Sequence, residues 1–266
     1  MKNNLVIGSD GFIGKPFCDF LEKKGEAVTR FDIKRGAEED ARISILPLED
    51  IDCVYFLAWD VGGAKYLYKE DAQLGQLDWN LKLLSNVMTQ LEKSKKPFLF
   101  ISSQLAEEHD TVYGVTKRLG EVWTRIIGGT FIRQWNVYGP MEEESLRSHV
   151  VADFVHQALT TKEIKMMTTG EEKRQFIYID DVCEAWYKAL NEKHKGIHDV
   201  TSFEWVKIID IANIIGKLTG AKVIPGEKVG STPITPIKGK IPGWSPKVEL
   251  EEGLRRTIEL YKKINE

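Results

Sequence analysis

The stretch Leu5-Val6-Ile7-Gly8-Ser9-Asp10-Gly11-Phe12-Ile13-Gly14 decides the fold of this 266-residue chain. A short apolar run leads directly into a glycine-rich turn. The apolar positions that follow are those of a helix and a second strand, which ends at Phe31-Asp32. Glycine lets a backbone approach a phosphate closely, and the first N–H groups of a helix point at such an anion. The stretch therefore predicts a strand, turn and helix that bind the phosphates of a nucleotide.

An acidic residue stands at the distance that a dinucleotide site requires. Asp32 lies 24 residues beyond Gly8, close to the roughly 20-residue spacing of a carboxylate that binds the ribose hydroxyls of NAD. A carboxylate also repels the 2′-phosphate of NADP, but Lys34 and Arg35 keep NADP as the alternative cofactor. The glycine spacing of three and three is not the commonest one, and an ordinary strand-turn-helix has the same pattern, so the prediction of NAD depends on the rest of the chain.

Strands and helices alternate through the first 140 residues. Apolar runs of strand length at 53–58, 98–101 and 130–135 are separated by stretches of helical periodicity at 78–95 and 111–127. This alternation predicts βαβ units and a parallel sheet, and hence an α/β fold. Ligands of such sheets bind beyond the carboxyl ends of the strands. The residues to examine there are Gly8 to Gly14, Asp32, Ala58 to Gly63, Ser102-Ser103 and Asn136.

The pattern changes after residue 140. We expect helices at 149–160, 180–190 and 248–264 and a strand at 176–179. Thr201-Ser202-Phe203-Glu204 has the pattern of a capping box, which predicts a further helix from 201 to about 218. Residues 222–242 are rich in Gly and Pro and are predicted to be irregular. Since no long linker interrupts the chain, any second domain should pack closely on the first.

Composition narrows the class of protein. The net charge of −3, from 37 basic and 40 acidic side chains, argues against nucleic acid as a partner. The apolar runs are too short to span a bilayer, and no apolar signal-peptide core follows Met1, so we expect no membrane association and a cytoplasmic location. The three cysteines are far apart and the five histidines lack ligand spacing, which favours reduced thiols and no metal site.

Tyr113 and Lys117 are four residues apart at the start of a predicted helix, so they share one face about one turn apart. A tyrosine with a pKa near 10 is a poor base at neutral pH. A neighbouring ammonium and the positive ring of oxidised NAD both favour its phenolate. Tyr113 could then take the proton from a substrate hydroxyl while hydride leaves the same carbon, with Ser103 holding the oxygen. Two exposed residues of a helix can have the same spacing. The catalytic interpretation therefore depends on the order of the motifs along the chain: the glycine turn, the acid after the second strand, the serine at a strand end, and then Tyr113 and Lys117.

This order of parts resembles that of the extended short-chain dehydrogenases/reductases, and among them the NAD-dependent nucleotide-sugar epimerases and dehydratases. The resemblance covers nearly the whole chain. It is carried by the Gly8–Gly14 turn, Phe56-Leu57-Ala58, Asn80 in Asn-Leu-Lys-Leu-Leu-Ser-Asn-Val, the Ser103, Tyr113 and Lys117 set, Arg133-Gln134-Trp135-Asn136-Val137-Tyr138-Gly139-Pro140, and Arg174-Gln175-Phe176-Ile177-Tyr178-Ile179-Asp180-Asp181-Val182.

The resemblance implies a Rossmann-type doubly wound parallel sheet with a smaller C-terminal substrate-binding domain. Residues 1–140 plus about 176–200 would bind NAD, and 141–175 plus 201–266 would bind the substrate. The family also implies a homodimer formed through helices at 79–95 and 112–127.

The resemblance also implies roles for single residues. Catalysis would fall to Tyr113, Lys117, Ser103 and Asn80, with Asn80 supporting a proton relay. NAD would contact Gly8, Asp10, Gly11, Phe12, Ile13, Gly14, Asp32, Ile33, Leu57, Ala58 and Lys117. The nucleotide-sugar substrate would contact Ser103, Asn136 and Arg174, the last two near its diphosphate, because a guanidinium can bind two phosphate oxygens together.

Two departures from the family narrow the reaction. Only nine residues, Gln104 to Val112, separate Ser103 from Tyr113, which predicts a pocket that is more open on that side. Gln104-Leu105 stand where 4,6-dehydratases carry an acidic pair, which disfavours dehydration. The sequence favours an NAD-dependent epimerase that oxidises and reduces one sugar carbon, with C4 preferred. The alternatives are an NAD(P)H-dependent keto-sugar-nucleotide reductase, a sugar-nucleotide dehydratase and a non-catalytic dinucleotide sensor. The nucleotide and the sugar stay open.

Overall fold

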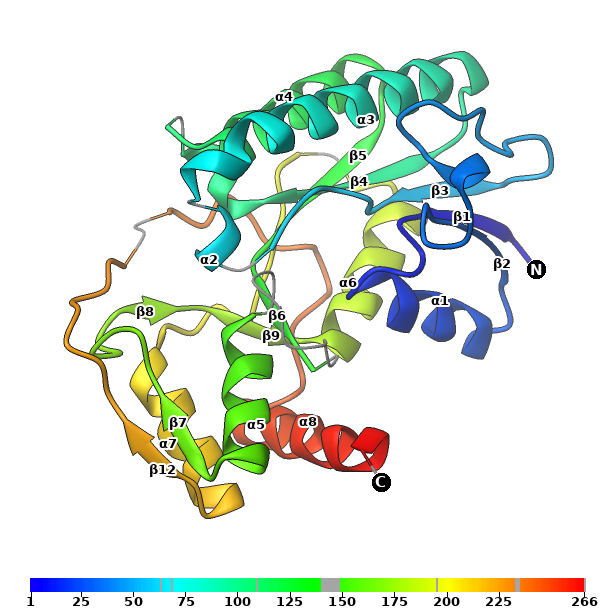
Figure 1. The fold of residues 1–266 in the computed structure, drawn as a ribbon. Helices are drawn as coiled ribbons and strands as arrows, with labels where there is room; N and C mark the ends of the chain where they lie inside the picture. Colours follow the sequence, from blue (N-terminus) through cyan, green and yellow to red (C-terminus); the bar gives the residue numbers. More distant parts are fainter. Residues whose placement is uncertain are drawn as a thin grey trace.

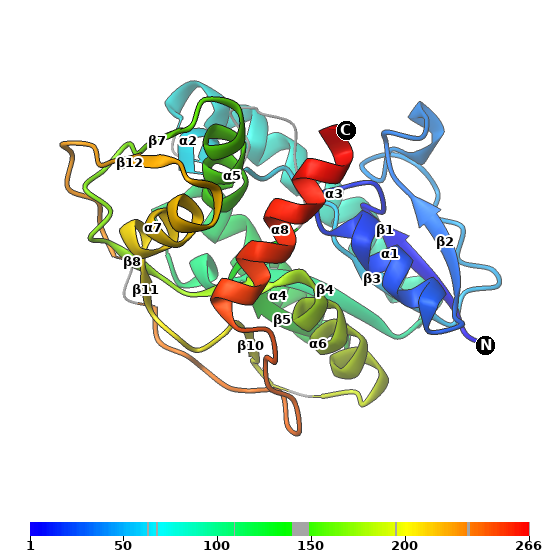
Figure 2. The same ribbon diagram turned by 90° about the horizontal axis from the view of Figure 1, so that it is seen from below.

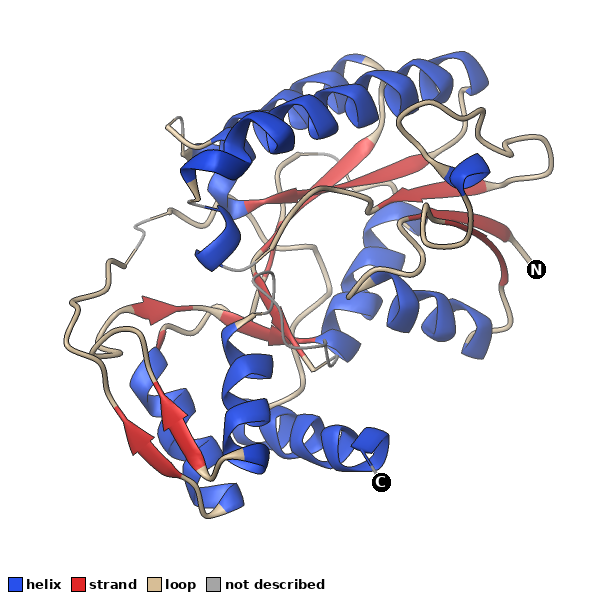
Figure 3. Ribbon diagram, viewed as in Figure 1, coloured by secondary structure: helices blue, strands red, loops and turns tan. Residues whose placement is uncertain are grey.

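A six-stranded parallel sheet forms the centre of the N-terminal part (Figures 1 and 3). The computed structural model describes residues 1–62, 64–67, 69–108, 110–139, 149–194, 196–232 and 235–265. The strands, in spatial order, are β10 (Asp199–Val200), β5 (Thr130–Gln134), β4 (Phe98–Ser103), β3 (Cys53–Phe56), β1 (Asn3–Ile7) and β2 (Ala27–Phe31). Leu5 of β1 lies opposite Thr29 of β2 and Val54 of β3. The strand order reverses at β1, which places a ligand crevice between the ends of β1 and β3.

Helices cover both faces of this sheet. α1 (Gly14–Lys23) and α6 (Ile179–Asn191) lie on one face, and α3 (Gln73–Ser94) and α4 (Val112–Ile126) lie on the other (Figures 1 and 2). Neighbouring residues of a strand point to opposite faces. Tyr55 accordingly packs on Phe17 of α1, with ring centroids 4.7 Å apart, whereas Phe56 packs on Phe100 and on the buried residues of α3. The predicted α/β fold with a doubly wound parallel sheet is confirmed.

The remaining helices gather below the sheet in Figure 1. They are α5 (Val150–Thr160), α7 (Ile208–Thr219) and α8 (Leu250–Asn265). Three strand pairs accompany them: β6 (Asn136–Tyr138) with β9 (Phe176–Tyr178), β7 (Glu163–Lys165) with β12 (Lys222–Ile224), and β8 (Lys173–Arg174) with β11 (Val206–Lys207). Short helical turns are η1 (Ala37–Glu39), α2 (Ala64–Leu67), η2 (Glu70–Ala72) and η3 (Gln104–Glu107). We propose that the chain divides functionally as the sequence suggests, at residues 140, 176 and 200.

The predicted start of the helix at residue 201 is wrong, because α7 begins at Ile208. Ser202 accepts a hydrogen bond from the backbone of Glu204 in a local turn, and Phe203 adopts a φ of +64°. Val206 and Lys207 then pair with β8, which keeps the chain extended until α7 begins at Ile208. A strand pairing with a distant segment therefore overrides the local capping pattern. Pro140, the last residue of the family-like segment that begins at Arg133, lies outside the residues that the structure describes.

Three further observations concern the chain as a whole. Cys18, Cys53 and Cys183 are free thiols, and all three are buried. Among the described residues, no group of three His, Cys, Asp or Glu side chains could hold a metal ion. No helix in the described part of the chain has the length and apolar character needed to cross a membrane.

Candidate active site

A cavity of about 1560 Å³ opens at the carboxyl ends of the sheet strands and extends to α5, α8 and β8. Almost all the site residues expected from the sequence line it. They are Gly8, Asp10, Gly11, Phe12, Ile13, Gly14, Asp32, Ile33, Leu57, Ala58, Ser103, Tyr113, Lys117, Asn136 and Arg174. Asn80 is the exception. The volume exceeds the roughly 300–1,000 Å³ of a pocket for one small ligand, so the cavity has room for two.

The glycine turn is built for close approach. Gly8 has a φ of +92°, and a Cβ atom there would lie 2.6 Å from the backbone nitrogen of Ala58. A Cβ atom on Gly14 would overlap the Gly8 carbonyl oxygen. Ile13, before the first residue of α1, supplies no side-chain cap. In the first turn of α1, Lys15 donates its backbone N–H to the Gly11 carbonyl oxygen at 3.2 Å and Pro16 has no N–H, which leaves the Gly14 N–H for an anion in the cavity.

Asp32 is buried at the end of β2 and held rigidly. Its carboxylate accepts hydrogen bonds from the backbone N–H groups of Asp10, at 3.0 Å, and Lys34, at 2.9 Å. The two cations that favoured NADP have partners within the protein. The Lys34 ammonium donates to the Asp10 carbonyl oxygen at 2.9 Å, and Arg35 lies 3.7 Å from Asp10 and 3.5 Å from Glu39. The rim of the cavity next to Asp32 is thus acidic, which suits a ribose with free hydroxyls.

Ser103 and Tyr113 come together in the middle of the cavity. The Ser103 hydroxyl donates to Gln104 Oε1 at 3.1 Å and accepts from the backbone N–H of Leu105 at 3.2 Å. Burial raises the pKa of Tyr113 to about 12, although a hydrogen bond with Ser103 opposes this rise. Thr111 caps α4 by accepting from the N–H of Gly114 at 3.0 Å, which fixes where the Tyr113 helix begins.

Lys117 is turned differently from the sequence expectation. Its ammonium donates to the carbonyl oxygen of Ile101 at 2.6 Å and lies 5.8 Å from the centre of the Tyr113 ring. Burial holds the pKa of Lys117 well below its usual value, and the Glu121 carboxylate opposes this. The position of this ammonium therefore does not lower the pKa of Tyr113, which burial raises.

Asn80 holds a loop. The Asn80 side chain accepts from the backbone N–H of Asp60 at 2.8 Å and donates to the Asp60 carbonyl oxygen at 3.2 Å. Asp60 follows the end of β3 and lines the cavity, and its carboxylate accepts from the Tyr66 hydroxyl at 2.7 Å. Asn80 thus positions Asp60 and does not contact Tyr113 or Lys117. Asp60 belongs to residues 58–63, which the sequence analysis selected as strand-end residues without assigning Asp60 a role.

The far end of the cavity is polar. Asn136 donates to the Gln175 carbonyl oxygen at 2.8 Å. Arg174 donates to the carbonyl oxygens of Lys173 and Ser231, each at 2.8 Å. Glu172 and Gly230 line the same region and were not selected from the sequence. Glu172 stands two positions before Arg174, which was the available signal, because alternate residues of a strand share a face.

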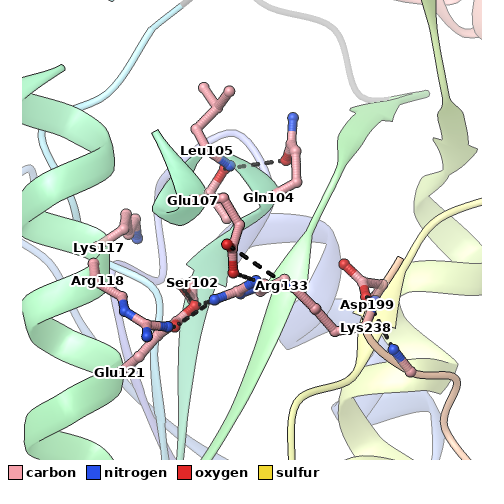
Figure 4. Close-up of polar contacts among 12 residues, drawn as sticks. Ser102, Gln104, Leu105, Glu107, Lys117, Arg118, Glu121, Arg133, Asp199 and Lys238 are labelled. Atoms are coloured by element: carbon pink, nitrogen blue, oxygen red, sulfur yellow. Dashed lines mark hydrogen bonds and ion pairs between the residues drawn. The ribbon is translucent and has the colours of Figure 1, made fainter. Parts of the chain in front are cut away.

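A buried ion-pair network joins the elements that carry Ser103, Tyr113 and Lys117 (Figure 4). Arg133 of β5 is fully buried and donates to both oxygens of Glu121, at 2.7 and 2.8 Å, and to Glu107 at 2.5 Å. Burial alone would lower the pKa of Arg133, but its bonds to Glu121 and Glu107 raise it. Glu121 belongs to α4, which carries Tyr113 and Lys117, and Glu107 belongs to η3, which follows Ser103. Arg133 therefore fixes these two parts of the site relative to each other.

A sequence model described as the NAD dependent epimerase/dehydratase family matches residues 4–201, about three quarters of the chain. The chain belongs to this family. The resemblance read from its motifs is thereby confirmed, and the protein is an enzyme of the NAD-dependent epimerase/dehydratase family.

Relatives of this epimerase/dehydratase-family enzyme include proteins of different activity. A UDP-N-acetyl-alpha-D-glucosaminuronate decarboxylase of Bacillus cytotoxicus is 26% identical over 321 residues, covering 99% of this chain and 98% of the relative. A putative UDP-glucose 4-epimerase of Methanocaldococcus jannaschii is 26% identical over 58% of this chain and 54% of its own length. The fold matches a UDP-glucose 4-epimerase structure from Thermotoga maritima, with a TM-score of 0.78, 24% identity, and coverage of 99% of this chain and 100% of that one.

The residues of this epimerase/dehydratase-family enzyme fit its cofactor. NAD requires a phosphate cradle without side chains and an acceptor for its ribose hydroxyls. The cavity provides the first at Gly8 to Gly14, where added Cβ atoms would collide with backbone, and the second at the buried carboxylate of Asp32. Leu57 and Ala58 complete the wall at the end of β3.

Proposed function

We propose that this enzyme is a nucleotide-sugar epimerase that oxidises and then reduces one sugar carbon, C4, through a transient keto sugar. The observation that carries this proposal is the pairing of Ser103 and Tyr113 in the cavity that also contains the glycine turn and Arg174. A proton-transfer site, a dinucleotide cradle and a guanidinium for a diphosphate then share one space, as a sugar nucleotide and NAD together require.

The residues of the chain handle the proton of the reaction. NAD, held by the Gly8–Gly14 turn and Asp32, would supply the hydride acceptor and donor and a positively charged ring. Tyr113 takes the proton of the C4 hydroxyl and later gives it back to the same oxygen. Ser103 forms a hydrogen bond to that oxygen and fixes its place. Because burial alone keeps the Tyr113 phenol neutral, we infer that its activation depends on the loaded enzyme.

The surroundings of Ser103 support epimerisation over dehydration. Gln104 follows Ser103 and is buried beside it, and a carboxamide is neither an acid nor a base near neutral pH. The nearest carboxylate on η3, Glu107, is bound to Arg133, which holds its pKa below the usual value. We assign neither residue to removal of a proton next to the keto group.

The substrate contacts in this proposal are Asn136 and Arg174. Both line the far end of the cavity, and Arg174 suits a diphosphate because its donors can bind two oxygens together. We also propose a homodimer. The outer faces of α3 and α4 expose apolar side chains, at Leu81, Val115, Leu119 and Ile126, which are 39–74% exposed. A second copy of the chain that covered them would remove this apolar surface from water.

A panel of sugar nucleotides labelled with deuterium at C4, with products read by NMR, tests the reaction. We expect the C4 epimer to form without added cofactor and to keep its label. Tyr113→Phe should lower turnover by about 10²- to 10⁴-fold while NAD stays bound, whereas Tyr261→Phe on α8 should not. Oxidation of NADPH with a 4-keto-sugar nucleotide, without epimerisation of the labelled panel, would instead identify a keto-sugar reductase, and binding without turnover a sensor.

A further inference from the structure

The buried carboxylate of Glu172 leaves one oxygen without a partner. Its Oε1 accepts a hydrogen bond from the Thr168 hydroxyl at 2.5 Å, but its Oε2 is buried and has no hydrogen-bond partner. The whole residue is 9% exposed. Burying an acceptor without a donor costs free energy, so such groups need an explanation. Within the described part of the chain, the other buried side-chain atoms without a partner belong to Tyr55, Trp59, Gln76 and Thr124, and of these only Trp59 also lines the cavity.

Glu172, the residue before β8, lies on the same side of the extended chain as Arg174. Glu172 is buried, Lys173 is exposed and Arg174 is half-buried, which is the alternation of an extended chain. Glu172 and Arg174 both line the cavity. Two residues along a strand span about 7 Å. In a nucleotide the ribose is joined directly to the first phosphate, so a diphosphate bound at Arg174 would bring its nucleoside close to Glu172.

A short segment, residues 230–232, covers Glu172 in this structure; we call it the strap. The Ser231 carbonyl oxygen accepts from Arg174, and the Thr232 hydroxyl accepts from the backbone N–H of Lys173 at 2.8 Å. A Cβ atom on Gly230 would lie 2.5 Å from Glu172 Oε2, so the backbone of this segment lies directly against the Glu172 carboxylate. Arg174 and Glu172 are therefore the two side chains on which the strap rests.

We propose that Glu172 Oε2 accepts a hydrogen bond from the nucleoside of the bound nucleotide, once the strap has moved off it. The donor is a ribose hydroxyl or an N–H group of the base. This inference rests on the proposed function, in which a nucleotide diphosphate binds Arg174. Phosphate oxygens replace the Ser231 carbonyl as the acceptor for Arg174, and this frees the strap. An ionised carboxylate only accepts hydrogen bonds, so Glu172 selects ligands with a donor at this point.

Calorimetric titration of the NAD-loaded full chain with UDP tests the inference. Glu172→Leu should weaken UDP binding by about tenfold or more, since it removes a hydrogen bond to a charged group. The affinity for NAD should not change, and the melting temperature without nucleotide should stay equal or rise, because the unpartnered oxygen is gone. Glu172→Gln keeps the shape of the side chain and one acceptor oxygen, so it should lose less UDP affinity than Glu172→Leu. Glu171→Leu, which changes the exposed neighbour, should bind UDP like the wild type.

Two further ligands identify the donor. If the wild type prefers UDP to its 2′-deoxy form and Glu172→Leu loses this preference, the donor is a ribose hydroxyl. If Glu172→Leu loses a preference between UDP and CDP, the donor is on the base. If Glu172→Leu binds UDP within twofold of the wild type, the inference is wrong and the proposed function stands. The same holds if Glu172→Leu has a lower melting temperature together with weaker NAD binding. A wild type that binds no nucleoside diphosphate would overturn the proposed function as well.

Discussion

The ammonium nitrogen of Lys117 lies 4.0 Å from the centre of the Trp59 ring while it donates to the Ile101 carbonyl oxygen. The face of an indole stabilises a positive charge. Trp59 comes from the end of β3 and Lys117 from α4, so the contact joins the cofactor wall to the catalytic helix. Burial disfavours the Lys117 ammonium, and the indole face offsets part of that effect.

Replacing Trp59 should therefore make Lys117 lose its proton more easily. In Trp59→Leu we expect the alkaline limb of the kcat/KM profile to move to lower pH by about one unit, because a cation–π contact of roughly 1 kcal/mol is removed. Trp59→Phe keeps an aromatic face and should move the limb less. Identical profiles for the two variants and the wild type would show that the indole does not stabilise Lys117.

The ionisation of Tyr113 should depend on the cofactor. Burial raises its pKa to about 12 in the structure without ligands, and we expect bound NAD to lower it through the positive ring. The difference in ultraviolet absorbance between the wild type and Tyr113→Phe, titrated with and without NAD, measures this change. A Tyr113 that ionises near 10 without NAD would contradict the structure.

The same shift has a consequence for stability. Since the folded pKa of Tyr113 is raised above that of the unfolded chain, the neutral phenol is favoured in the folded state. Its contribution to the free energy of unfolding is fully present below pH 10 and is lost as the pH rises from about 10 to about 12. Tyr113→Phe should therefore lose less stability than the wild type in that range.

The preference for NAD over NADP should depend on Asp32. Asp32→Ala should weaken NAD binding by about tenfold or more, because a charged acceptor for the ribose hydroxyls is lost. NADP should lose less, since the carboxylate no longer repels its 2′-phosphate. Asp32→Asn keeps one acceptor oxygen for the backbone N–H groups of Asp10 and Lys34, so it controls for disruption of the turn. If both variants lose equal affinity for NAD and for NADP, Asp32 does not determine the preference between the two cofactors.

Arg133 should be among the most sensitive positions for stability. Arg133→Leu leaves Glu121 buried without its main partner, and breaking a buried ion pair costs about 3–5 kcal/mol of unfolding free energy. Glu107→Gln should cost much less, because Glu107 is partly exposed and a carboxamide oxygen can still accept from Arg133. Urea denaturation measures both. Similar losses in the two variants would contradict a network centred on Glu121.

The proposed dimer predicts that a charge on α4 separates the subunits. Light scattering should find the wild type as a dimer and Leu119→Glu as a monomer, because burying a carboxylate in an apolar interface is strongly unfavourable. Leu260→Glu places the same charge on α8, at similar exposure and outside the proposed interface, and should stay dimeric. A monomeric wild type would rule out the proposal.

The parts of the site that follow from local sequence were predictable. Gly8 and Ser103 follow strands with apolar runs, Asp32 follows the mixed strand β2, and the strand ends of a parallel sheet meet at one edge. The direction of the Lys117 ammonium was not predictable. Its four-residue spacing places it on the Tyr113 face of α4, but the Ile101 carbonyl and the Trp59 ring that hold it come from other strands.

Tertiary contacts explain the other differences. The capping pattern at residue 201 did not begin a helix, because Val206 and Lys207 pair with β8 from a distant part of the chain. The hydrogen bonds by which the Asn80 amide holds Asp60 were likewise not visible in the sequence, and its part in a proton relay stays a prediction. The unpartnered oxygen of Glu172 is a property of the folded chain, since a sequence shows which groups accept hydrogen bonds but not which of them lack a donor.

The three buried cysteines make the protein a convenient subject for site-directed labelling. Alkylating reagents attack the thiolate, and burial raises the pKa of Cys18 to about 12 and that of Cys53 to about 11, and also raises the pKa of Cys183. All three should resist a maleimide dye while the protein is folded. A cysteine introduced in place of Ser231 would then react selectively, and the fluorescence of its dye would report the movement of this segment in real time as a nucleotide enters.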